Sequence, residues 1–171
     1  MTTVKKELTQ PFLGTPNDTN TFHFMDEKVT VLVSGEVTND KLVILNIKKP
    51  ANSGPPAHIH NNEPEIFVVL KGTMTFYVGD KVIEAKEGDV VIAPKGIKHT
   101  FITGSEGAEF NVIASPAGFD SFVKALGTPV KADAPMPKVE PITEEQMIGL
   151  INASIPYGIS YPDIEKEISK K

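Results

Sequence analysis

Short runs of alternating or β-branched apolar residues dominate the first two thirds of the chain. The runs are KVTVLVS at 28–34, KLVILNIKK at 41–49, IFVVL at 66–70, and further segments at 73–78, 81–85, 89–93, 99–103 and 109–114. A period of two is typical of strands with one buried face, and many short strands at close spacing indicate a sandwich or barrel. Between two of them, Gly79-Asp80 suits a type II′ hairpin turn. The pattern therefore predicts an all-β fold of antiparallel strands over 21–116.

The period changes after Pro116. Apolar residues at 119, 122, 123 and 126 share one face of a helix, which predicts a short helix within 117–127 that ends at Gly127. The proline-rich segment 128–142 reads as a linker. Thr143 and Gln146 form a capping box, so a second helix should run to about Ser154. A short charged helix should follow Pro162 in the tail 143–171, which we expect to pack on the barrel or on a partner subunit. Residues 1–20 read as a polar N-terminal arm.

Composition removes several chemistries. The chain has 171 residues and a formal net charge of −5, contains no cysteine, and has lysine at all 17 basic positions. Thiolate metal sites and disulfides are therefore excluded, as is the planar guanidinium clamp for phosphate. Scattered lysines in an acidic chain do not favour nucleic acid as a partner. The sequence shows no signal peptide and no apolar run long enough to span a bilayer, so we expect no membrane partner and a cytoplasmic location.

Three of the four histidines fall in a pattern that suits a metal ion. His58 and His60 are two residues apart, so on a strand their imidazoles point to the same face. Asn61-Asn62 and Pro64 predict a turn that brings Glu65 back toward them. His99 begins another strand after the turn at 94–96. Three imidazoles and one carboxylate suit a first-row divalent metal such as Fe, Mn, Ni, Co, Cu or Zn, with positions left for water, substrate or O₂.

These residues also carry a resemblance to the cupin superfamily. The run HIHNNEPEIFVVLKG resembles its first motif, with His58, His60, Glu65 and Gly72 in place. The run GDVVIAPKGIKH resembles the second, with Gly88, Pro94, Gly96 and His99 in place. The opening glycine of the first motif is Asn52 here, and the asparagine that often closes the second is Thr103. The resemblance implies a jelly-roll barrel with a short C-terminal helical extension, often as a homodimer.

A narrower similarity links GPPAHIHNNEPEIFVVLKG and the segment 115–129 to cupins described as quercetin 2,3-dioxygenase-like. It implies a metal-dependent dioxygenase, an oxidoreductase that acts with O₂ on a small aromatic or enolic compound. It also implies that Glu65 is both a metal ligand and the catalytic residue that accepts the substrate's proton. Two alternatives remain open at this point. The same site could serve a metal-dependent isomerase or lyase, or the protein could bind a small molecule without catalysis.

Four further residues bear on the predicted site. Glu63 is an alternative ligand to Glu65; if Glu65 is the ligand, Glu63 lies at the rim or supports a ligand from behind. Phe67 and Phe101 lie two residues beyond Glu65 and His99, so they should point into the same interior. There they either pack in the core or line a substrate pocket beside the metal. His23 has no second ligand at a defined spacing, and we expect a structural or interface role for it.

Overall fold

Antiparallel sheet dominates the computed structural model, which describes residues 11–138 and 141–168. The strands of the main sheet follow the order β6-β5-β8-β3-β2-β1-β9, and β7 pairs with β5 beside this path. Their bounds are β1 Thr21–Phe24, β2 Glu27–Val33, β3 Val43–Lys49, β5 Glu65–Val78, β6 Lys81–Lys86, β7 Val90–Ala93, β8 His99–Ala114 and β9 Thr128–Pro129. A second, two-stranded sheet joins β4 (Ile59–His60) to β10 (Ile159–Ser160). The predicted all-β fold is confirmed.

Two pairs of predicted strands are in fact single long strands. The runs at 66–70 and 73–78 are continuous in β5, and those at 99–103 and 109–114 are continuous in β8. The pairing of β5 with β8 shifts register between Val69 and Lys71 and again between Gly72 and Met74. Gly72 has a φ of 84°, a conformation that glycine adopts at little cost. Lys71-Gly72 therefore marks β-bulges within one bent strand, where the sequence pattern predicted two separate strands.

The barrel interior is filled by residues that alternate along the strands. In β3, Val43, Leu45 and Ile47 are buried with Lys49, while the residues between them are partly or fully exposed. Aromatic rings from β5 and β8 meet at the centre, where the ring centroids of Phe67 and Phe101 lie 5.9 Å apart. The predicted hairpin at Gly79-Asp80 is present, since Val78 pairs with Lys81.

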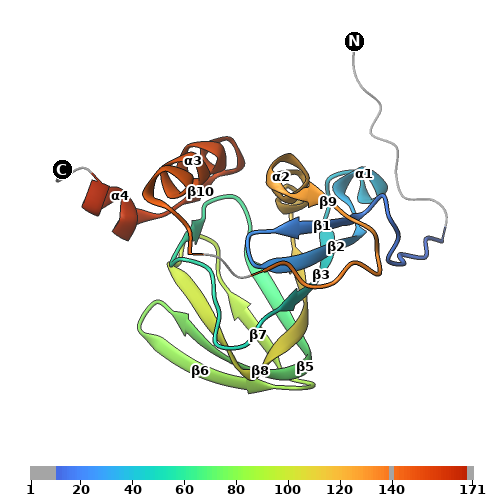
Figure 1. The fold of residues 1–171 in the computed structure, drawn as a ribbon, viewed down its shortest axis with the longest axis horizontal. Helices are drawn as coiled ribbons and strands as arrows, with labels where there is room; N and C mark the ends of the chain where they lie inside the picture. Colours follow the sequence, from blue (N-terminus) through green and yellow to red (C-terminus); the bar gives the residue numbers. More distant parts are fainter. Residues whose placement is uncertain (1–10, 139–140, 169–171) are drawn as a thin grey trace, which may run out of the picture.

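Short helices gather at one end of the barrel, and β6 lies at the opposite end (Figure 1). They are α1 Gly35–Thr38, α2 Phe119–Leu126, α3 Glu144–Ser154 and α4 Pro162–Ile168, with a 3₁₀ turn at Ile155–Tyr157. The capping box of α3 is present as predicted. No helix in the described ranges is long and apolar enough to cross a membrane.

The proline-rich segment after α2 is attached to the barrel rather than extended away from it. Its first residues form β9, which pairs with β1. His23 Nε2 donates to the carbonyl oxygen of Pro135 at 2.9 Å, and Lys28 Nζ donates to that of Ala134 at 2.7 Å. His23 thus has a structural contact far from the other three histidines. Parts of the predicted arm, linker and tail, at 1–10, 139–140 and 169–171, lie outside the described residues.

Candidate metal centre

Three neighbouring strands bring His58, His60, Glu65 and His99 together. His58 forms a reciprocal antiparallel bridge with His99, with N–O distances of 3.0 and 2.9 Å. His60 lies on β4, while Glu65 and His99 are the first residues of β5 and β8. The chain reverses at Asn61-Asn62, as the turn residues predicted, and so returns Glu65 to the histidines. One ligand atom from each of the four residues lies within 4.8 Å of the others.

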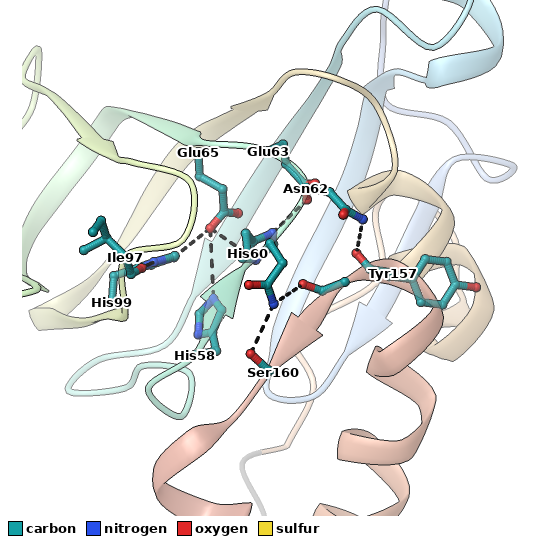
Figure 2. Close-up of polar contacts among 11 residues, drawn as sticks. His58, His60, Asn62, Glu63, Glu65, Ile97, His99, Tyr157 and Ser160 are labelled. Atoms are coloured by element: carbon teal, nitrogen blue, oxygen red, sulfur yellow. Dashed lines mark hydrogen bonds and ion pairs between the residues drawn. The ribbon is translucent and has the colours of Figure 1, made fainter.

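The three imidazoles present their Nε2 atoms to the same carboxylate oxygen (Figure 2). Glu65 Oε2 lies 2.9 Å from His99 Nε2, 3.3 Å from His60 Nε2 and 4.0 Å from His58 Nε2. The side chains of Glu65, His60 and His99 are 2–3% exposed, and that of His58 is 12% exposed. Three nitrogens and one oxygen therefore face a small volume that is almost closed to solvent.

The opposite ring nitrogen of each histidine already has a hydrogen-bond acceptor. His58 Nδ1 donates to the Pro56 carbonyl oxygen at 2.8 Å, and His99 Nδ1 donates to that of Ile97 at 2.9 Å. His60 Nδ1 donates to Glu63 Oε1 at 2.8 Å. These contacts favour the tautomer that carries its proton on Nδ1, which leaves the Nε2 lone pairs available to a metal ion.

The positions of Glu63 and Glu65 separate the two carboxylates that the sequence left open. Glu65 faces the Nε2 side of the imidazoles, whereas Glu63 contacts His60 from behind, at Nδ1. Glu63 is itself 2% exposed. Glu65 therefore shares the side of the imidazoles on which the three Nε2 atoms converge, and Glu63 lies on the other side of the His60 ring.

The charges and pKa values of the clustered side chains favour a bound cation. Burial lowers the pKa of His58 to about 4, so its imidazole is neutral at neutral pH. Burial also acts to lower the pKa of His60, but attraction to Glu65 and the hydrogen bond to Glu63 outweigh it and raise that pKa. Burial acts to raise the pKa of Glu65, yet His60 and the other imidazoles lower it to about 2. A charged carboxylate thus lies among imidazoles that have little access to water.

An apolar cavity of about 50 Å³ is lined by three of the four residues, His58, His60 and Glu65. A single water molecule needs roughly 10–15 Å³ of such space, so the cavity has room for several waters or a small ligand. Phe67 and Phe101 both line it and are 2% and 5% exposed, so they also belong to the aromatic core. Its other aromatic rings come from Phe24, Phe110, Phe119, Phe122 and Tyr161.

The same cavity includes residues that the sequence analysis missed. Glu27 and Lys49 line it from β2 and β3. One signal was available, because alternation along β3 places Lys49 on the same face as Ile47. Ile159 and Tyr161 line the cavity from the C-terminal segment, where β10 pairs Ile159 with His60. The two-residue strand β10 has no comparable sequence signal.

Comparison with known proteins supports the cupin superfamily for this barrel. Residues 46–114 match the cupin domain family. The fold is similar to an RmlC-like cupin from Shewanella frigidimarina, with a TM-score of 0.50 and 19% identity over 57% of this chain and 83% of that one. It is also similar to oxalate decarboxylase OxdC of Bacillus subtilis, with a TM-score of 0.53 and 18% identity over 67% of this chain and 33% of that one.

Two fungal relatives carry oxidoreductase names. The probable oxidoreductase virH of Hypocrea virens is 36% identical over 72 residues, which cover 40% of this chain and 33% of virH. Oxidoreductase OpS7 of Beauveria bassiana is 44% identical over 57 residues, which cover 32% of this chain and 18% of OpS7. The matched segments thus span a third or less of each relative.

The residues present fit a divalent metal. Cupins commonly bind such an ion, and the cluster of His58, His60, Glu65 and His99 offers the imidazole and carboxylate donors that first-row divalent metals accept. Each imidazole is held at Nδ1, as is usual for histidines that coordinate through Nε2.

Proposed function

We propose that this protein is a metal-dependent oxidoreductase of the dioxygenase type, acting on a small aromatic or enolic compound. The observation that carries the proposal is the convergence of three Nε2 atoms and Glu65 Oε2 beside an aromatic-lined cavity. The oxidoreductase names of the fungal relatives agree with this class of reaction. A cupin fold also suggests a small-molecule ligand.

His58, His60, Glu65 and His99 are the proposed metal ligands. A bound divalent ion would supply Lewis acidity, which lowers the pKa of a hydroxyl that it coordinates. Glu65 would also be the catalytic proton acceptor that the quercetin dioxygenase resemblance implies. Phe67 and Phe101 would contact the apolar part of the substrate and exclude water from it, while Glu63 would keep the His60 ring in place.

The test combines elemental analysis with oxygen uptake. Protein loaded separately with Fe, Mn, Co, Ni or Cu should consume O₂ with at least one member of a panel of flavonols, catechols and enediols. His60→Ala should abolish that uptake, whereas His23→Ala should leave it unchanged. The absence of O₂ uptake across all metals and compounds would overturn the dioxygenase assignment. Turnover under argon with zinc alone would indicate the isomerase or lyase alternative instead, and a ligand retained without turnover would indicate a binding protein.

We also propose a homodimer formed through the outer face of β7, β5 and β8. Val90 and Ile92 point outward from β7 and are 58% and 54% exposed. They lie opposite Val68 and Ile66 of β5, and Ile66 in turn pairs with Ile113 of β8. A two-fold axis through this cross-strand patch of aliphatic side chains would bring the same side chains of two copies into contact.

Light scattering coupled to size exclusion tests this contact. Ile92→Lys should convert a dimer to a monomer, whereas Val82→Lys should not, because Val82 is equally apolar and 64% exposed but lies on β6, outside the patch. A monomeric wild-type protein at micromolar concentration would contradict the proposal.

A further inference from the structure

A buried cluster of three charged side chains lies at the ends of β2 and β3. Lys49 Nζ is 2.6 Å from Asp26 Oδ1 and 3.0 Å from Glu27 Oε2. The side chains of Lys49, Glu27 and Asp26 are 1%, 10% and 18% exposed. Ser53 Oγ donates a short hydrogen bond to Asp26. An ammonium group carries three N–H donors, and these two carboxylates accept from two of them.

This cluster shares its cavity with the proposed metal ligands. Glu27 and Lys49 line the cavity from β2 and β3, and Glu65 lines it from β5. The negative charge of Glu65 contributes to raising the pKa of Glu27, as expected for two carboxylates that line one cavity. Among the cavity-lining residues, Glu27 is the carboxylate that is not surrounded by imidazoles.

Stability alone does not account for these charges. A buried ion pair is often no more stabilising than apolar side chains of similar volume, because removing charges from water is costly. The surrounding positions are filled by apolar residues such as Ile47, Phe110 and Val112. The adjoining β1–β2 turn also holds Met25 at a φ of 56°, which is unfavourable for a residue with a side chain. Charge and backbone strain are thus concentrated at one wall of the cavity.

The protonation of the two partners differs. Burial acts to lower the pKa of Lys49, but attraction to Glu27 and Asp26 outweighs it, so the ammonium remains charged. Burial raises the pKa of Glu27 by more than its contact with Lys49 lowers it. A carboxylate of this kind takes up a proton more readily than an ordinary glutamate does, and an efficient general base requires a pKa closer to neutrality.

We propose that Glu27 is a second catalytic acid–base residue of this site and that Lys49 binds the oxyanion formed beside it. This inference rests on the proposed function and deepens it, because it makes the substrate a molecule with an ionisable hydroxyl, a phenol or an enol. In the step, the substrate O–H bond breaks and the proton moves to a Glu27 carboxylate oxygen. The electron pair stays on the substrate oxygen, whose negative charge then accepts a hydrogen bond from Lys49.

Proton release during ligand binding tests this step without turnover. The probe is 4-nitrocatechol, whose visible spectrum reports whether its hydroxyl is ionised, and the protein is loaded with zinc under argon. Proton release is measured by calorimetry in buffers of different ionisation enthalpy, between pH 5 and pH 9. Glu27→Gln is compared with wild-type protein and with Glu84→Gln, which removes an exposed carboxylate on β6.

The expected result is a pH window, between the pKa of Glu27 and that of the free probe, in which the wild-type protein binds ionised probe without releasing a proton. In the same window Glu27→Gln should release about one proton per probe bound, and its affinity should rise about tenfold per pH unit. A proton that this variant still retains would lie on Glu65 instead and would overturn the inference. Glu84→Gln should match the wild type. Glu27→Asp, which keeps a carboxyl, should retain the window with weaker binding.

Three results for the wild-type protein would also overturn the inference: no binding of the probe, binding of the un-ionised probe, or release of about one proton throughout this window below the pKa of the free probe. The third result needs no variant, so the test stands even if Glu27→Gln fails to fold. Because the assay contains no O₂, a failed oxygen-uptake screen leaves it unaffected. Oxygen uptake by a wild-type protein that releases the proton would preserve the proposed metal-dependent oxidation and remove both Glu27 and Glu65 as acceptors of the proton.

Discussion

Two walls of one cavity are built in different ways. The wall with His58, His60 and Glu65 comes from residues that are close in sequence, and His99 adds a fourth ligand atom to their cluster. The wall with Glu27 and Lys49 joins residues on two strands and presents an ammonium and a carboxylate that already neutralise each other. The first wall thus gathers donor atoms for a cation, whereas the second holds an ammonium group of its own. The comparison separates the proposed metal site from the proposed place for proton transfer.

The largest expected effect is the loss of metal from the histidine wall. His99→Ala removes one Nε2 donor from a cluster with three, so metal affinity should fall by about a hundredfold or more. A competition assay with a chromophoric chelator measures it. His23→Ala is the matched control, because His23 contacts Pro135 and lies outside the cluster. Equal losses in both variants would mean that the wrong histidine has been assigned to the metal.

Loss of the Lys49 charge from the second wall should lower the free energy of unfolding and leave the metal content unchanged. Lys49→Met leaves Asp26 and Glu27 buried without a cation, and the free energy of unfolding should fall by about 3–5 kcal/mol. Urea denaturation at pH 7 measures this loss, and the zinc affinity of the folded variant should stay within about threefold of wild type.

The neighbouring lysine provides the control for this variant. Lys48 lies on the opposite face of β3, where its side chain is 47% exposed and pairs with Glu109 at 3.5 Å. Lys48→Met should therefore cost less than about 1 kcal/mol. A similar loss in both variants would show that burial of the Lys49 charge is not what makes it important.

A smaller loss of zinc affinity is expected from a change to Glu63, which accepts a hydrogen bond from His60. Glu63→Gln keeps the shape of the side chain but removes the charge that accepts from His60 Nδ1. Zinc affinity should fall by about 10- to 100-fold, as for other groups that orient a metal-binding histidine. The chelator assay used for His99→Ala measures it, with Glu84→Gln as the exposed control. An unchanged affinity would mean that the His60 ring is held by packing alone.

The smallest effect is a dependence of metal binding on pH. Attraction to Glu65 and Glu63 raises the folded-state pKa of His60, so protons compete with a metal ion for this imidazole at a higher pH than for an ordinary histidine. The pKa of His58 is lowered to about 4, and this imidazole competes for protons only in more acidic solution. Zinc affinity should therefore decline as pH falls from above 6.5, by about tenfold or less per pH unit. Affinity that is constant between pH 8 and pH 5 would contradict a three-histidine site.

The two walls also differ in how well the sequence predicted them. The HxH spacing, the turn at Asn61-Asn62 and the carboxylate of Glu65 act over a few residues, so strand geometry was enough to bring them together. The partnership of Glu27 with Lys49 depends on the β2–β3 register, in which Lys28 pairs with Lys48. Alternation could place Lys49 inside the barrel, but it could not select its partner.

The errors in the fold have a similar origin. Lys71-Gly72 resembles a turn, and only its pairing across β8 shows that β5 continues through a bulge. The two residues of β10 are too few to give a periodic signal, and their partner β4 is equally short. Local patterns predicted elements, hairpins and the helix cap of Thr143; contacts between distant segments determined where the strands join and which residues close the cavity.

The placement of Ile159 and Tyr161 has a consequence for the order of assembly. All four proposed ligands precede residue 100, whereas these two cavity-lining residues come from the segment that pairs with β4 near the end of the chain. Synthesis proceeds from the N-terminus, so the barrel and its histidines emerge from the ribosome before the residues that cover them. A metal ion that binds during translation reaches the histidines before Ile159 and Tyr161 cover them, whereas one that binds afterwards must pass these side chains.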